Sequence, residues 1–115
     1  MQEDKTVFDK DEALKMLEGE EEFLKELAGI FINDAPEHMS EIEEAVNCRN
    51  SEALVTSAHK LKGSAANFGK NITTDIAFKL ETMGRENNLD GAEEVYGTLV
   101  KNIERLVNAL KEFVE

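Results

Sequence analysis

The chain has 115 residues with 25 acidic and 13 basic side chains, which gives a net charge of −12 at pH 7. This length is expected to form one domain, and the negative charge argues against a protein that binds nucleic acid. The sequence has no apolar run near the roughly 18 residues of a membrane span, and its first residues lack the basic and apolar regions expected of a signal peptide. Its lone Cys48 fits a reducing cytoplasm.

A polar tail at residues 1–6 is followed by a short predicted helix. Asp9 precedes that helix and Glu12 comes three residues later, which is the pattern of an N-terminal capping box. Gly19 then marks the end of the helix, because glycine is common just after a helical C-terminus. The small size of this helix predicts a lid over one end of the molecule.

A second, much longer helix is predicted to begin near Glu20, where acidic residues favour the positive end of the helix dipole. Pro36 interrupts it by removing one backbone donor. No loop-like cluster flanks the proline, so we expect a kink within one helix rather than a junction of two. The inner face of this helix is expected to consist of Phe23, Leu27, Ile30, Phe31, Met39, Ile42 and Val46.

A third helix is predicted next, capped by Ser51 and ended by Asn67 and Gly69. Its apolar residues recur at spacings of three and four, which is typical of a helix that buries one narrow stripe. That stripe consists of Leu54, Ala58, Leu61, Ala65 and Phe68.

Two more helices complete the prediction. The inner face of the first, at about residues 71–86, consists of Ile72, Ile76, Leu80 and Met83. The second begins at another capping box, Asp90 with Glu93, and its apolar side holds Ala92, Val95, Leu99, Ile103, Leu106, Leu110 and either Phe113 or Val114. No strand pattern competes, and the turns are short. The expected fold is therefore all-α, an antiparallel four-helix bundle with a short extra N-terminal helix, over residues 7–115.

His59 lies beside the apolar stripe of the third helix, and Lys62 and Gly63 share its side because residues three and four apart are neighbours on a helix surface. A glycine inside a helix costs roughly 0.8–1 kcal/mol relative to alanine, so Gly63 is expected to leave a useful open space near the imidazole. Residues 54–85 carry a net charge of +3, while the segments before and after carry −11 and −4. This contrast is either ordinary fluctuation in a small sample or a docking site for an acidic pocket.

Two motifs in this part of the chain resemble those of a known family. Residues 59–64, which read His-Lys-Leu-Lys-Gly-Ser, and the later Gly69 are similar to the signature of histidine-containing phosphotransfer (HPt) domains of bacterial and fungal phosphorelays. Residues 80–85, Leu-Glu-Thr-Met-Gly-Arg, resemble the second helix motif of that family. The likeness extends upstream to Phe31 and so covers nearly the whole chain.

The resemblance implies reversible phosphoryl transfer between His59 and an aspartyl phosphate on a partner, by a phosphocarrier without autonomous kinase activity. Lys62, as a point charge one turn away, is expected to stabilise the phosphoryl oxygens, and Gly63 is expected to give the partner access. The residues expected to surround the site and to dock the partner are Lys60, Ser64, Glu81, Gly84 and Arg85.

Glu81 departs from the family pattern, because several relatives carry a neutral polar residue at this position. We expect it to hold Arg85 or Lys62 by an ion pair, while Arg85 adds charge at the rim of the site. Gly84 is expected either to let the fourth helix pack closely or to leave room for the partner.

The remaining polar positions have weaker predicted roles. Ser64 is expected to hydrogen-bond near the imidazole or back to a helix carbonyl, and Lys60, about 100° around the helix from His59, is expected to meet the partner or only solvent. His38, the other histidine, is interpreted as a surface or structural residue.

The expected partners are response-regulator receiver domains and a hybrid histidine kinase, with the chain itself a monomer that binds neither nucleic acid nor membrane. The sequence has no phosphate-binding glycine loop and no carboxylates at metal-ligand spacing, so no cofactor or metal is expected and magnesium should come with the partner. Two other functions stay open. The first alternative is the phosphoacceptor domain of a chemotaxis-type kinase, and the shortness of the chain argues against it. The second is a helical adaptor that docks on receivers without carrying phosphate, and the presence of His59 and Lys62 argues against that.

Overall fold

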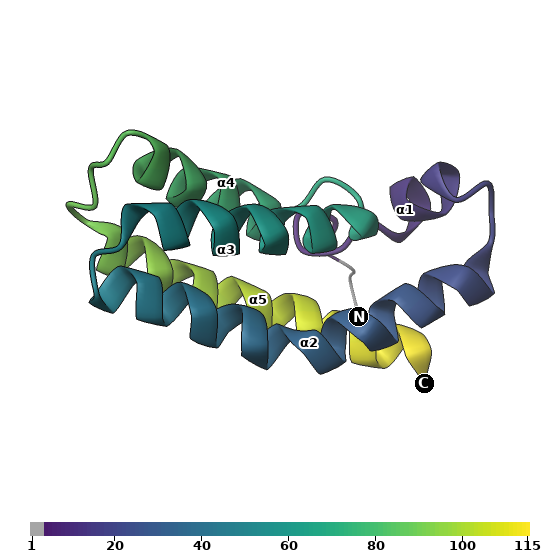
Figure 1. Cartoon of the computed structure of the whole chain (residues 1–115). Helices are drawn as coiled ribbons and strands as arrows, with labels where there is room; N and C mark the ends of the chain where they lie inside the picture. The colour runs from purple at the N-terminus through teal and green to yellow at the C-terminus, as the bar shows by residue number, and fades with distance from the viewer. Residues whose placement is uncertain (1–3) are drawn as a thin grey trace.

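The structure is a computed structural model that describes residues 4–115. Within these residues it has five α-helices and one short 3-10 helix, and no strand: α1 (Lys10–Met16), α2 (Glu21–Asn47), α3 (Ser51–Ala65), η1 (Ala66–Phe68), α4 (Ile72–Arg85) and α5 (Ala92–Val114). Figure 1 shows α3 and α4 above α2 and α5, with successive helices antiparallel and α1 at the end that holds both termini. The predicted four-helix bundle with a short N-terminal helix is confirmed.

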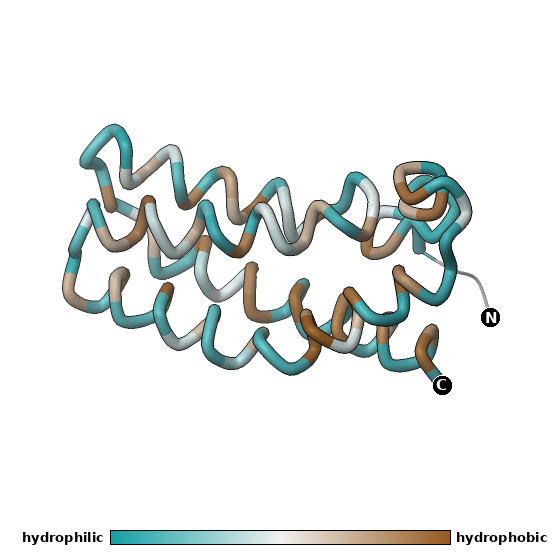
Figure 2. The backbone as a smooth tube through the Cα atoms, turned by 45° about the vertical axis from the view of Figure 1, so that its right-hand side comes forward, coloured by the Kyte–Doolittle hydropathy of each residue, from teal (hydrophilic) through white to brown (hydrophobic). Residues whose placement is uncertain are grey.

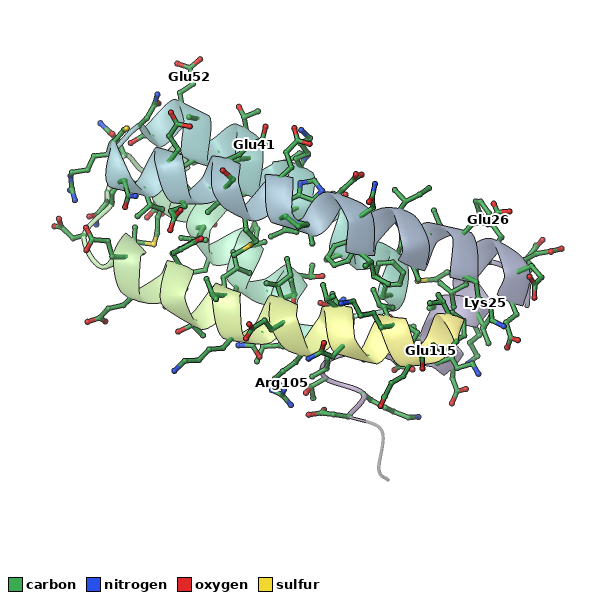
Figure 3. All side chains as sticks on the ribbon, turned by 90° about the horizontal axis from the view of Figure 1, so that it is seen from below. Lys25, Glu26, Glu41, Glu52, Arg105 and Glu115 are labelled. Atoms are coloured by element: carbon green, nitrogen blue, oxygen red, sulfur yellow. The ribbon has the colours of Figure 1, made fainter. Side chains whose placement is uncertain are left out.

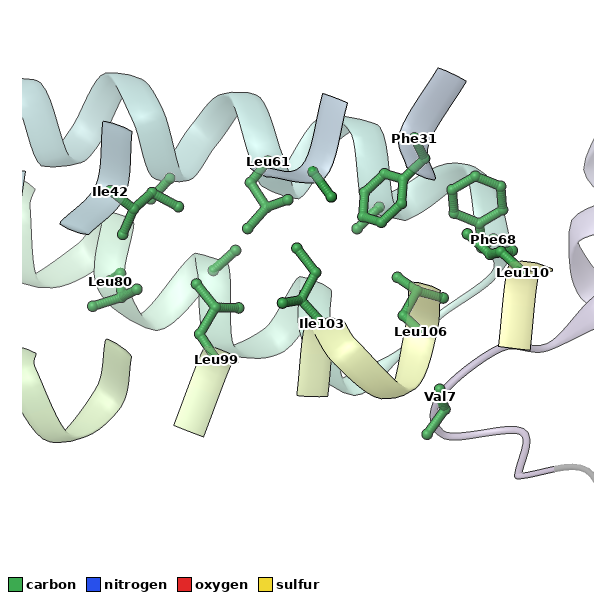
Figure 4. Close-up of a cluster of buried hydrophobic side chains, with 14 of the residues drawn as sticks. Val7, Phe31, Ile42, Leu61, Phe68, Leu80, Leu99, Ile103, Leu106 and Leu110 are labelled. Carbon is green, nitrogen blue, oxygen red and sulfur yellow. The ribbon is translucent and has the colours of Figure 1, made fainter. Parts of the chain in front are cut away.

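The core lies between the four long helices, each of which contributes one buried stripe (Figure 4). Hydrophilic residues separate the hydrophobic ones along every helix (Figure 2), as expected for helices with one face in water. All five residues of the stripe predicted on α3 are fully buried. Full burial of a leucine or phenylalanine side chain contributes about 1.5–3 kcal/mol, so this stripe fixes how α3 is rotated and leaves His59 on the surface.

The predicted inner face of α2 is partly wrong. Phe23 and Ile30 are 47% and 58% exposed, because the buried face of the N-terminal half runs instead through Leu24, Ala28 and Phe31, which share the three-to-four spacing of the rest of the helix. This half of α2 has apolar residues on two sides, and the sequence pattern alone does not say which side meets the core. Pro36 lies inside α2, and the prediction of one long helix is confirmed.

The buried face of α4 also differs from the prediction. Leu80 is buried as expected, but Ile72, Ile76 and Met83 are only partly buried. The residues that turn inward on α4 are mostly small or polar: Thr73, Ala77, Leu80, Glu81 and Gly84. Small side chains let α4 lie close to α3, and this close packing sets the rotation of α4.

Two predicted helix caps are wrong. Asn50, not Ser51, caps α3, and its side-chain oxygen accepts a 3.0 Å hydrogen bond from the backbone of Ala53. At the start of α5 no side chain caps the helix, and Gly91 occupies the capping position with φ of +85°. That left-handed conformation suits glycine, so the capping box proposed for Asp90 does not form.

One end of the bundle is closed by the N-terminal segment and α1, as the predicted lid would require. Phe8 packs edge-to-face on Phe68, with ring centroids 6.1 Å apart, and the side chain of Asp9 caps α1 as predicted. Gly69 ends η1 with φ of +81°, and a Cβ atom there would lie 2.9 Å from Asp9, so both its conformation and its surroundings require glycine.

The polar tail predicted at residues 1–6 falls partly on residues 1–3, which lie outside the described residues. The backbone oxygen of Thr6 accepts a 2.7 Å hydrogen bond from the backbone of Ile72. Asp4 pairs with Arg105 of α5 at 2.7 Å, and Figure 3 labels Arg105 on that helix. Within residues 4–115, no helix combines the length and the apolar character needed to cross a membrane.

Candidate functional site

His59 lies on the outer surface of α3, where its side chain is 63% exposed. Its ring turns toward α4, and Nδ1 lies 3.1 Å from Oε2 of Glu81. The two residues come from antiparallel neighbours in the bundle, so the contact depends on how closely α3 and α4 approach each other.

Gly84 permits that close approach. A Cβ atom at this position would lie 2.8 Å from both the backbone oxygen of Ser51 and Cγ2 of Val55, closer than real Cβ atoms pack. Of the two roles considered for Gly84, close packing of α4 on α3 is therefore the one that the structure supports. Glu81 precedes Gly84 by one helical turn and is carried against α3 with it.

Glu81 is the centre of the polar network, although only 1% of its surface is exposed. Oε1 lies 2.8 Å from Nζ of Lys62, and Oε2 accepts hydrogen bonds from Arg85, whose Nε is 3.2 Å away, as well as contacting His59. The expectation of an ion pair with Lys62 or Arg85 is confirmed for both. A buried carboxylate is costly when it lacks partners, and here Oε2 accepts hydrogen bonds from Arg85 while Oε1 forms an ion pair with the ammonium of Lys62.

Two opposing effects on the pKa of Glu81, burial and hydrogen bonding, together keep its carboxyl group ionised. Burial by itself would raise its pKa, but hydrogen bonds from Lys62, Arg85 and His59 outweigh burial and lower the pKa to about 2. A carboxylate that is ionised at neutral pH accepts hydrogen bonds and donates none. The 3.1 Å contact therefore requires the proton of a neutral His59 ring to lie on Nδ1, which leaves the lone pair on Nε2.

Gly63 adds open space beside this network. A Cβ atom built on Gly63 would meet no heavy atom within 4 Å, as the sequence interpretation expected. Ser64, one residue further on, is partly buried. Among residues 4–115 its hydroxyl makes no hydrogen bond, whereas its backbone oxygen accepts one from Asn67.

Lys60 lies away from the network. Its ammonium points across to α2 and lies 3.5 Å from Glu41, in a groove between α2 and α3 that Glu44 and Glu52 also line. The structure therefore brings together five of the predicted residues, His59, Lys62, Glu81, Gly84 and Arg85, and separates Lys60 from them. His38 is buried in α2, in agreement with a structural role.

Phe78 of α4 is a residue of this site that the sequence interpretation missed. Nζ of Lys62 lies 4.9 Å from the centroid of the Phe78 ring, within the range of a cation–π interaction. The ring is 55% exposed. Its position outside the predicted apolar stripe of α4 is the signal from which an exposed aromatic side chain could have been inferred.

The side chains around His59 suit the transfer of an anionic group. Within the described part of the chain, no three His, Cys, Asp or Glu residues are grouped to hold a metal ion. An exposed ring nitrogen with a lone pair is a nucleophile, and Lys62 and Arg85 supply positive charge near it.

Two curated proteins are similar to this chain in sequence. The phosphorelay intermediate protein rdeA of Dictyostelium discoideum is 29% identical over 92% of this chain and 42% of its own length. The phosphorelay intermediate protein YPD1 of Candida albicans is 34% identical over 69% of this chain and 43% of its own length. The chain thus spans about two fifths of the length of these curated relatives.

A solved structure and a family model match as well. The fold is similar to the crystal structure of histidine-containing phosphotransfer protein B from Pseudomonas aeruginosa PAO1, with a TM-score of 0.85, 20% identity and 95% of both chains covered. The model of the Hpt domain family matches residues 26–112, a range that contains His59, Lys62, Glu81 and Arg85. The chain belongs to the Hpt domain family.

Proposed function

We propose that this chain is a histidine phosphocarrier of a two-component phosphorelay, which accepts and donates a phosphoryl group at Nε2 of His59. The observation that carries the proposal is the exposed imidazole whose Nδ1 contacts the buried, ionised Glu81. The ammonium of Lys62 lies 2.8 Å from Oε1, the other oxygen of the same carboxylate. The names of the two curated relatives, both phosphorelay intermediates, point in the same direction.

In the forward step the lone pair of Nε2 attacks the phosphorus of an aspartyl phosphate on the partner. The bond between phosphorus and the aspartate oxygen breaks, and the aspartate leaves as a carboxylate. The proton stays on Nδ1, so the phosphorylated ring of His59 carries one positive charge, which the Glu81 carboxylate faces at 3.1 Å. The reverse step restores the neutral ring.

Positive charge and open space serve the same step. Lys62 and Arg85 offset the negative charge of the phosphoryl oxygens, which is the main requirement of phosphoryl transfer together with positioning. Gly63 leaves room for the loop of the partner that carries the phosphoryl group. The partner is a response-regulator receiver domain, which brings its own magnesium. A hybrid histidine kinase supplies the phosphoryl group that enters the relay.

The chain acts as a carrier and not as a kinase, since its chemistry needs only a nucleophile and charge stabilisation. Cys48 is exposed and free, which fits a reducing compartment such as the cytoplasm.

The test is incubation of the chain with a phosphorylated receiver domain and magnesium, followed by detection of protein-bound phosphate. We expect an acid-labile, base-stable phosphate on the wild type, none on His59→Gln, and undiminished label on His38→Gln, which controls for the loss of a histidine. Binding of the receiver without any label would favour the adaptor function instead. Label that arrives only from ATP and a kinase domain would favour the phosphoacceptor of a chemotaxis-type kinase.

A further inference from the structure

The ammonium of Lys62 has two neighbours of different chemistry. Oε1 of Glu81 lies 2.8 Å from Nζ, and the centroid of the Phe78 ring lies 4.9 Å from it. The Lys62 side chain is only 25% exposed as a result. Phe78 comes three residues before Glu81 on α4, so the ring and the carboxylate lie on the same side of that helix.

Packing in the core does not explain Phe78. Its ring is 55% exposed and lies outside the cluster of buried side chains, even though α4 supplies other residues to that cluster. An aromatic side chain normally gains free energy from burial. The ring contacts the cation of Lys62, which is attracted to the negative face of the π-system.

The ring and the carboxylate act differently on Lys62. Glu81 attracts the ammonium but also neutralises its charge, whereas Phe78 attracts it and carries no charge of its own. Nζ of Lys62 and Nδ1 of His59 contact the two oxygens of the same carboxylate. A phosphoryl group on the imidazole therefore competes with Glu81 for the ammonium of Lys62. Because the Phe78 ring holds the flexible side chain of Lys62, it favours positions in which the ammonium can contact the carboxylate and the phosphoryl group.

We propose that Phe78 is a positioning residue, which holds the ammonium of Lys62 at the phosphoryl group carried by His59. This role rests on the proposed function, because it concerns the rate of phosphoryl transfer. It differs from a direct contact between the Phe78 ring and the receiver domain, which would act on binding of the receiver and not on Lys62.

NMR of the chain without any partner tests the contact between Phe78 and Lys62. In the wild type we expect the ring current of Phe78 to shift the ε-methylene resonances of Lys62 upfield, because Nζ lies 4.9 Å from the ring centroid. Phe78→Leu keeps an apolar side chain but removes the π-system, and we expect it to abolish this shift, whereas Phe78→Tyr retains it. Identical Lys62 resonances in the wild type and in Phe78→Leu would overturn the proposal.

Single-turnover kinetics with a phosphorylated receiver domain test the consequence. At saturating receiver, Phe78→Leu is expected to lower the transfer rate about two- to fivefold, the factor that corresponds to an exposed cation–π contact. The receiver concentration at half saturation is expected to stay the same, and Phe78→Tyr is expected to restore the rate. In a Lys62→Ala background, Phe78→Leu should have no further effect.

Two patterns of slowed or weakened transfer would assign Phe78 a different role. One is a raised half-saturation concentration with an unchanged maximal rate, which would assign the ring to receiver binding. The other is an equal loss of rate with and without Lys62. If the wild type accepts no phosphoryl group at all, the proposed function fails and the role of Phe78 fails with it. If the wild type accepts it and Phe78→Leu transfers equally fast, the role of Phe78 fails alone.

Discussion

Replacing Glu81 by glutamine keeps the shape of this buried side chain and removes its charge. The pKa of Glu81 is lowered from 4.5 to about 2, which corresponds to about 3 kcal/mol of preference for the ionised form in the folded protein. Arg85 and His59 are more than half exposed and regain water when the carboxylate is lost. We therefore expect Glu81→Gln to lower the free energy of unfolding at pH 7 by about 1–3 kcal/mol.

The same numbers predict a dependence on pH. A carboxyl group whose pKa is lower in the folded than in the unfolded state stabilises the fold fully above the unfolded value, here 4.5. That stabilisation is lost as the pH falls from 4.5 toward 2. The difference in stability between wild type and Glu81→Gln should therefore shrink to less than half at about pH 3. Other carboxylates titrate equally in both proteins and cancel in the difference.

Urea unfolding followed by circular dichroism, at pH 7 and near pH 3, measures this difference. Glu86→Gln is the matched control, because Glu86 is exposed at the end of the same helix and its replacement should change stability by no more than about 0.5 kcal/mol. The reasoning would be refuted by a Glu81→Gln variant as stable as the wild type at pH 7, or by a difference that does not change with pH.

The other predictions concern single residues around the network. Lys62→Ala should slow transfer at least about tenfold and also lower stability by about 1–2 kcal/mol, because it leaves a buried oxygen of Glu81 without its cation; unchanged single-turnover rates would remove Lys62 from the site. Gly63→Gln should block transfer from the receiver while preserving or raising thermal stability, whereas Gly97→Gln, at an equally open position in α5, should leave transfer intact; equal transfer by both variants would contradict the steric role. Gly84→Ala should lower stability by about 1–3 kcal/mol, since its new Cβ meets backbone at 2.8 Å, and a thermal melt identical to that of the wild type would contradict close packing.

Much of this architecture could be predicted from the sequence because helical periodicity is a local property. The apolar stripe of α3 repeats at spacings of three and four with no competing side, so the exposed position of His59 followed directly. Phe23 and Ile30 were misassigned because α2 is apolar on two sides near its start. Only the packing of that segment in the bundle decides which side is buried.

The charge network was harder to predict, because burial of Glu81 depends on the distance between two helices. A glutamate on α4 would ordinarily be placed in water, since burial of a charge is costly. Gly84 removes the Cβ that would hold α4 away from α3, and only then does Lys62 come within 2.8 Å of the carboxylate. The contact between Phe78 and Lys62 depends on the same approach, and no spacing within one helix reveals it.

The most direct test of the central claim is to identify the atom that carries the phosphoryl group. NMR of ¹⁵N-labelled protein, phosphorylated by a receiver domain, distinguishes the two ring nitrogens through their coupling to ³¹P. The account predicts phosphorus on Nε2 of His59, with Nδ1 still protonated and hydrogen-bonded to Glu81. Phosphorus on Nδ1, or on any other residue of the chain, would contradict it.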